Sequence, residues 1–243
     1  CDTRIALFTV APIALTDFLG WVPLGNVNPP LHTFPSPHQY LYHTLAAGAL
    51  HTVAVVSPGD IVVTRVSRRV FSADGRNDYT INFASCREVT GYFNHMATLD
   101  ASINAGVGAF DRGCYTSSLQ PAYTDCTTRF VSLPVLAGAR LGVTGGVAGL
   151  LAWDCGLRDS RRAAIGYANP ARWSYGGYGS DPFHVVAASD YYAEPLRSQI
   201  AARLGSGDGT LHRTVPPLGG TLENDVPGTA QGAWWNAAQL VGT

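Results

Sequence analysis

Lysine is absent from this chain of 243 residues, and all 16 basic side chains are arginines. They nearly balance the 17 acidic residues, which gives a formal net charge of −1. Proteins that bind nucleic acids normally carry a clustered basic surplus for the phosphates. The nearest thing to a basic cluster is Arg158, Arg161 and Arg162, and we expect Asp159 to form an Arg–carboxylate pair there. We therefore expect no nucleic-acid partner.

Long apolar runs and methionine are also scarce. The most apolar stretch, VLAGARLGVTGGVAGLLAW, is interrupted by Arg140 and five glycines, so we expect no membrane-spanning helix. The chain has one Met but 27 Gly, 15 Pro and 11 Tyr. This composition favours short strands and turns over long helices.

Short β-branched runs recur between residues 40 and 159, for example HTVAVV, DIVVTRV, DYTINF and EVTGYFNHM. Turn sequences such as SPGD and SADGRND separate them, which predicts a mainly β protein with an antiparallel sandwich or barrel-like core. One short helix is predicted at 190–204, with Ser189 or Asp190 as its N-cap.

We expect one domain in three segments. Residues 1–22 form an N-terminal anchor and leader, 23–160 the β-rich core, and 161–243 an aromatic and Gly-rich extension that contains the helix.

Five cysteines suggest disulfides and an oxidising compartment. The chain has no Cys-x-x-Cys pair, so we do not expect the cysteines to bind a metal ion. Cys114 and Cys126 flank a polar, turn-rich stretch, so we predict that they pair. Cys86 and Cys155 then pair by elimination, although the other two connectivities of these four cysteines stay open.

Cys1 makes the cysteine count odd. A mature chain that begins with Cys resembles a bacterial lipoprotein, in which that residue carries the acyl chains. This resemblance implies lipid attachment at Cys1 and a location on the periplasmic or cell-surface face of a bacterial membrane.

Three histidines, His32, His38 and His43, crowd into the proline-rich segment NVNPPLHTFPSPHQYLYH. Imidazoles in such a setting are candidate metal ligands, or polar side chains that cap turns at the mouth of a sheet.

Four segments in order resemble the lysostaphin-type zinc endopeptidases: HTFPSPHQYLY, VVSPGDIVVTRV, VTGYFNHMATL, and VLAGARLGVTGG leading into LLAWDCGLRD. The resemblance spans about residues 23–159 and implies the duplicated hybrid motif fold of that family. It places His32 at the first zinc ligand and His95 in the Tyr-x-His strand.

The final strand of that family supplies His-x-His, whereas this chain has Ala152, Trp153 and Asp154. The resemblance therefore implies that one proton-handling His is missing and that Asp154 replaces a metal-binding His. A zinc site of His32, His38 and Asp154, with His95 as acid or base, keeps an enzyme possible.

Our leading prediction is a non-catalytic extracytoplasmic lipoprotein that serves as an accessory subunit of a membrane-bound assembly, such as an electron-transfer or photosynthetic complex. The alternatives are a zinc-dependent hydrolase of cell-wall peptide or glycan, and a carbohydrate-binding module. Surface aromatics are enriched at interfaces. The predicted contact residues are Trp173, Tyr175, Tyr178, Trp234 and Trp235.

Overall fold

The computed structural model describes residues 1, 3–28, 34–43, 52–118, 121–145, 152–173 and 181–233. His32, Tyr175, Tyr178, Trp234 and Trp235 lie outside these ranges, so their predicted roles stay predictions.

The described chain is built on one antiparallel sheet of 12 strands, with the main order β1-β2-β11-β6-β5-β4-β8-β7. The strands are β1 (Phe18–Val22), β2 (Gln39–His43), β3 (Ala54–Val56), β4 (Ile61–Phe71), β5 (Asn77–Ala84), β6 (Val89–Leu99), β7 (Arg112–Ser117), β8 (Tyr123–Thr127), β9 (Leu133–Val135), β10 (Arg140–Thr144), β11 (Ala152–Asp159) and β12 (Val185–Val186). The helices are α1 (Ala101–Val107), α2 (Pro170–Trp173), the 3-10 helix η1 (Ala188–Tyr191) and α3 (Leu196–Ala201). The predicted mainly β, antiparallel fold is confirmed, and the sheet is not closed.

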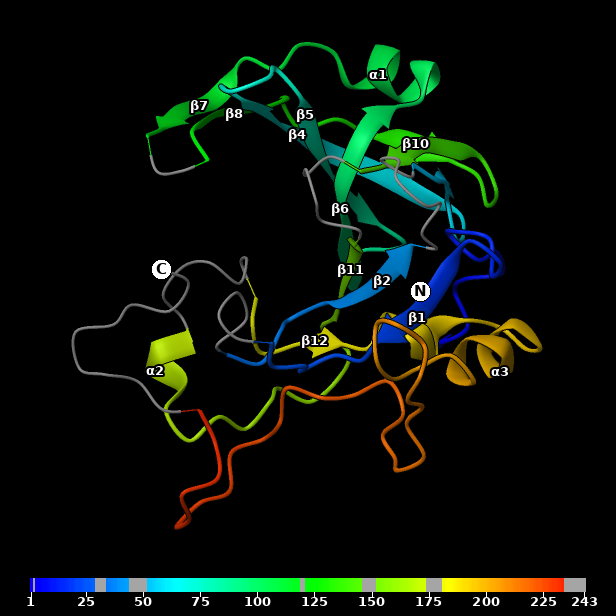
Figure 1. Ribbon diagram of the computed structural model, residues 1–243, viewed down its shortest axis with the longest axis vertical. Coiled ribbons are helices and arrows are strands. Elements are labelled where there is room, and N and C mark those ends of the chain that lie inside the picture. Colours follow the sequence, from blue (N-terminus) through cyan, green and yellow to red (C-terminus); the bar gives the residue numbers. More distant parts are fainter. Residues whose placement is uncertain are drawn as a thin grey trace.

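Figure 1 shows β6 and β11 in the middle of the sheet, with β1 and β2 towards one end and the β7–β8 hairpin at the other. The central strands carry the core on one face. Phe93 of β6 stacks between Phe83 of β5 and Trp153 of β11, with ring centroids 4.5 and 5.1 Å apart. All three rings are fully buried, so the apolar side chains of neighbouring strands hold the sheet together by burial and stacking.

The predicted helix at 190–204 is shorter than expected. Pro195 has no N–H and disfavours a helical conformation in the residue before it, so α3 begins only at Leu196. Ser189 and Asp190 belong to η1 instead of capping α3. Ile200 and Leu204 are buried, and Leu196 is partly buried.

The predicted disulfide between Cys114 and Cys126 is confirmed, and it links β7 to β8. The predicted pair of Cys86 with Cys155 is wrong, because Cys86 is bonded to Cys1 and Cys155 is a buried free thiol. Pairing by elimination failed because it reserved Cys1 for a lipid.

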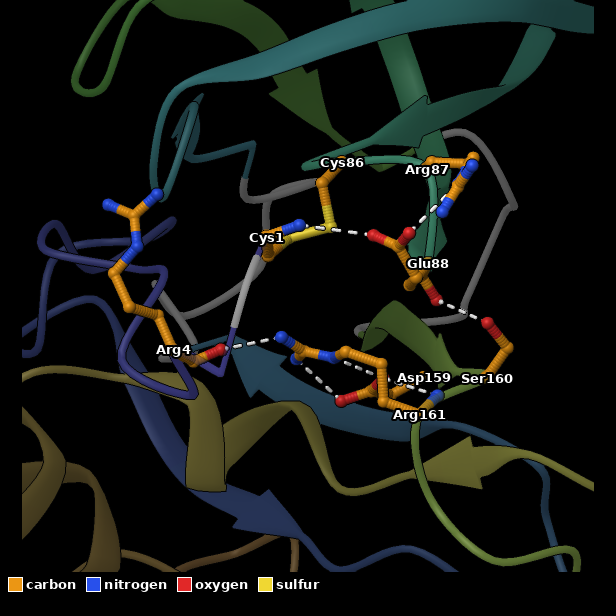
Figure 2. Close-up of polar contacts among 8 residues, drawn as sticks. All are labelled: Cys1, Arg4, Cys86, Arg87, Glu88, Asp159, Ser160 and Arg161. Carbon is orange, nitrogen blue, oxygen red and sulfur yellow. Dashed lines mark hydrogen bonds and ion pairs between the residues drawn. A yellow bond between two sulfur atoms is a disulfide. The ribbon is translucent and has the colours of Figure 1, made fainter.

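Figure 2 shows how the first residues are tied to the ends of β6 and β11. The main-chain nitrogen of Cys1 donates to the Glu88 carboxylate at 3.0 Å, and Arg161 Nη1 donates to the carbonyl of Arg4 at 2.9 Å. The same guanidinium pairs with the buried Asp159, with Nη2 2.7 Å from Oδ2. Because a disulfide sulfur cannot also carry a thioether-linked lipid, the predicted lipid attachment at the Cys1 sulfur is corrected to a disulfide.

Removing the Cys1–Cys86 disulfide in a Cys1→Ser/Cys86→Ser variant should lower the free energy of unfolding by about 2–4 kcal/mol, because a long loop gains freedom in the unfolded chain. Urea unfolding followed by tryptophan fluorescence measures the change. Cys155→Ala is the matched control, since it removes a buried thiol but no cross-link and buries no new polar group. Equal stability of the double variant and the wild type would show that the cross-link contributes nothing.

Candidate functional site

A row of polar side chains crosses the sheet on the face opposite the core. The strand register pairs Tyr40 with Asp154 and Asp154 with Asn94, and it pairs Ser67 with Thr80. Thr80 Oγ1 donates to Asn94 Oδ1 at 2.6 Å and joins the two halves. Directly paired residues share one face of a sheet, so these five residues form one continuous row, called here the polar row. At a strand spacing of about 4.8 Å it is about 19 Å long.

A β-bulge in β6 adds His95 to this face. Phe93 pairs with Ile81 and Met96 with Tyr79, so both Asn94 and His95 oppose Thr80. His95 has φ +64°, a left-handed conformation that non-glycine residues rarely adopt. The extra residue shifts the alternation of side chains, so that Met96 returns to the core while Asn94 and His95 both face the polar row.

His95 and His38 approach the same carboxylate oxygen. The Nε2 atom of His95 lies 3.1 Å from Asp154 Oδ2, and the Nε2 atom of His38 lies 3.5 Å from it. The second ring nitrogen of each histidine is also held, since His95 Nδ1 lies 3.1 Å from Asp78 Oδ2 and His38 Nδ1 lies 3.1 Å from the Tyr92 hydroxyl. Polar contacts therefore run from Asp78 through His95 and Asp154 to His38 and Tyr92, across β5, β6 and β11 and the residue before β2.

The two carboxylates set the charge of His95. Burial lowers the pKa of the imidazole, but the charge and hydrogen bonds of Asp154 and Asp78 outweigh burial and raise the pKa from 6.5 to about 10. At neutral pH His95 is therefore an imidazolium between two acidic residues.

Gly156 leaves the space that the Tyr92 ring occupies. A Cβ atom on Gly156 would lie 2.2 Å from the Tyr92 ring, so only glycine at this point of β11 lets the ring lie across the strand. The ring in turn positions the Tyr92 hydroxyl against His38.

The structure thus brings together three of the predicted site residues, His38, His95 and Asp154. Sequence reasoning missed Asp78 and Tyr92, which hold the outer nitrogens of the histidines. The bulge did leave a signal, because Phe93 and Met96 are apolar residues three apart in a strand that should alternate with a period of two.

Zinc fits this arrangement only in part. Tetrahedral zinc with bonds of about 2.0 Å separates its donor atoms by roughly 3.3 Å, close to the two distances to Asp154. Among the described residues, His38, His95 and Asp154 nevertheless do not form a group whose three ligand atoms all lie within 4.8 Å of one another. In the described part of the chain that condition is met by Cys1, Cys86 and Glu88, whose sulfurs form a disulfide.

The predicted contact residue Trp173 is not a surface residue. It is 2% exposed and stacks on Tyr167 with centroids 4.1 Å apart, in a small apolar cluster with Leu24 and Leu222. The Gly- and Tyr-rich neighbourhood suggested a surface strip, but this Trp fills a second core instead.

The disulfides indicate an oxidising, non-cytoplasmic location. No helix among the described residues is long and apolar enough to cross a membrane. Comparisons of the chain with protein-family models, with curated proteins and with solved structures give no match. The lysostaphin-type resemblance therefore stays a prediction.

We predict that His95 stays protonated well above neutral pH. Proton NMR of the imidazole should give a titration near pH 10 in the wild type, and a clearly lower one in Asp78→Asn because one of the two carboxylate charges is removed. His212→Gln identifies an exposed histidine signal as a control. A wild-type titration of His95 near 6.5 would contradict the ion-pair assignment.

The raised pKa of His95 also determines how the free energy of unfolding changes with pH. Because the pKa of folded His95 is raised, its stabilising contribution is complete below pH 6.5 and is lost as the pH rises from 6.5 towards 10. The free energy of unfolding should therefore fall more over this range in the wild type than in His95→Gln, measured by urea titration at each pH.

Gly156→Ala should destabilise the protein by about 1–3 kcal/mol, the usual cost of an overpacked site, because the new methyl group displaces the Tyr92 ring. Thermal unfolding measures the cost, and NMR signals of His38 should shift. Gly166→Ala is the matched control, since the nearest atom to a Cβ there is 3.8 Å away. Equal melting temperatures for the two variants would contradict this packing argument.

Proposed function

We propose that this protein is a non-catalytic, extracytoplasmic binding protein that holds a polar, chain-like ligand of the cell envelope on the polar row. The observation that carries the proposal is the row itself. Hydroxyl, amide and carboxylate groups from five neighbouring strands share this side, where Asn94, Thr80 and Ser67 are half-buried and Tyr40 and Asp154 are buried, and the other side of the same strands is core.

The surroundings of Asp154 support binding without catalysis. Ala152 lies two residues before Asp154 on the same face of β11, where the endopeptidase resemblance calls for a histidine. It is 3% exposed and packs with Val22 and Tyr40. A methyl group can neither take up nor release a proton, so the group that would activate water is missing at this position.

A zinc-dependent hydrolase of cell-wall peptide or glycan is the second candidate. It is favoured by the two imidazole Nε2 atoms that face Asp154 while Tyr92 and Asp78 hold their Nδ1 atoms. Hydrogen bonds of this kind commonly orient metal-binding histidines. His38 and Asp154 would be the residues to hold the ion, which when bound would supply Lewis-acid chemistry, and His95 would be the acid beside it.

Lipid anchoring and an accessory role in a membrane-bound assembly do not follow from the polar row. Anchoring through the Cys1 sulfur requires the Cys1–Cys86 disulfide to be open. The polar row supports a binding role with or without a membrane-bound partner.

Co-sedimentation with purified peptidoglycan sacculi tests the proposal. We expect the wild type to sediment and to release no soluble fragments, with or without added zinc. Asn94→Leu, which removes the centre of the polar row, should weaken binding about tenfold, the equivalent of one or two lost hydrogen bonds.

Thr98→Leu is the matched control, because Thr98 lies on the same strand, is exposed and is outside the polar row. Zinc-dependent release of fragments would replace the binding proposal with the hydrolase. A wild type that stays in the supernatant, or equal binding by both variants, would overturn the use of the polar row.

A further inference from the structure

A cavity of about 540 Å³ lies at the Tyr40 end of the polar row. Its walls come from β1 and β2, from residues 26–28 and from the loop 205–208. This volume is within the range of about 300–1,000 Å³ that is usual for small-molecule sites.

The cavity combines aromatic rings with hydrogen-bonding groups. Tyr40 and Tyr42 contact each other with ring centroids 5.6 Å apart and planes at 63°, and Asn26 Nδ2 donates to the Tyr40 hydroxyl at 2.7 Å. Asn28 and Asp208 add an exposed amide and a carboxylate. The described lining contains no arginine, so nothing charged positively at all pH values is present to bind an anion.

The wall of the cavity is formed before any ligand arrives. A Cβ atom on Gly207 would lie 2.3 Å from the Tyr42 ring, so the loop backbone packs directly on that ring. Asp208 fixes the loop, because its carboxylate accepts from Ser206 Oγ at 2.5 Å and from the Thr210 N–H at 3.1 Å. A preformed site loses little entropy on binding.

The cavity continues the polar row. Tyr40 is paired with Asp154, and Tyr42 with Ala152, so both rings stand on the same face as the row and next to its first carboxylate. A ligand group that fills the cavity therefore lies at one end of the polar row, and a longer ligand can extend from it along the row across the sheet.

We infer that this cavity binds a neutral sugar ring, and that the glycan to which the ring belongs continues along the polar row. A pyranose has an apolar C–H face and an edge of hydroxyl groups, which match the Tyr42 ring and the polar groups of Asn26, Asn28 and Asp208. The inference rests on the proposed binding function and adds to it the chemical class of the ligand.

Isothermal titration calorimetry with a soluble tetramer of N-acetylglucosamine tests the inference on the full chain. We expect binding by the wild type, a loss of about tenfold in Tyr42→Ala because one aromatic contact is removed, and a loss of about threefold in Asn28→Ala. Tyr42→Phe, which keeps the ring, should bind within about twofold of the wild type. Tyr115→Ala is the matched control, since Tyr115 is 52% exposed on β7 at the far end of the sheet.

No binding of the tetramer by the wild type, or equal affinity in Asn28→Ala and folded Tyr42→Ala, overturns the sugar site. A neutral peptide, pentaglycine, that binds in place of the tetramer also overturns it.

The two proposals fail separately. Suppose that the wild type binds sacculi, that Asn94→Leu binds them more weakly, and that Tyr42→Ala binds both sacculi and the tetramer like the wild type. The binding function then stands and the sugar site is wrong. If the tetramer binds through Tyr42 while sacculi are not retained, the sugar site stands and the role of the polar row falls.

Discussion

The pairing of β11 with β2 on one side and with β6 on the other is the constraint on which the candidate site depends. It sets Asp154 between Tyr40 and Asn94, and it brings His38 and His95 to the same carboxylate. On the reverse side the same pairing stacks Trp153 on Phe93. A register slip of one residue in β11 would exchange the two faces, placing Trp153 on the polar side and Asp154 in the core. The apolar stacking therefore fixes the polar geometry.

Much of the fold could be predicted because strands and turns are local signals. The β-branched runs, the turns between them and the disulfide of the β7–β8 hairpin all depend on neighbouring residues. The start of α3 shows the limit of that reasoning. The helix was predicted from residue 190, but Pro195 keeps the residues before it out of the helix, which begins at Leu196.

The candidate site could be predicted only in part. His38 was identified from the histidines crowded in a proline-rich segment, and His95 and Asp154 through a resemblance, whereas the contacts of Asp78 and Tyr92 depend on strand register and on the bulge. Long-range pairing was the harder problem for the cysteines as well. Cys1 and Cys86 are distant in sequence and meet only because the first residues lie against the start of β6. The burial of Trp173 likewise depends on Leu24 and Leu222, which come from distant segments.

The pairing of β2 with β11 also determines when the site can exist during folding. β2 lies near the beginning of the chain and β11 well past its middle, so their contact closes a long loop, and contacts between distant segments form slowly. β4, β5 and β6 can pair earlier, because each follows the last along the chain. We therefore expect His95 to be in place before Asp154 arrives, so that the ion pair between them forms only when β11 joins the sheet. A fragment that ends before β11 would contain both histidines and no site.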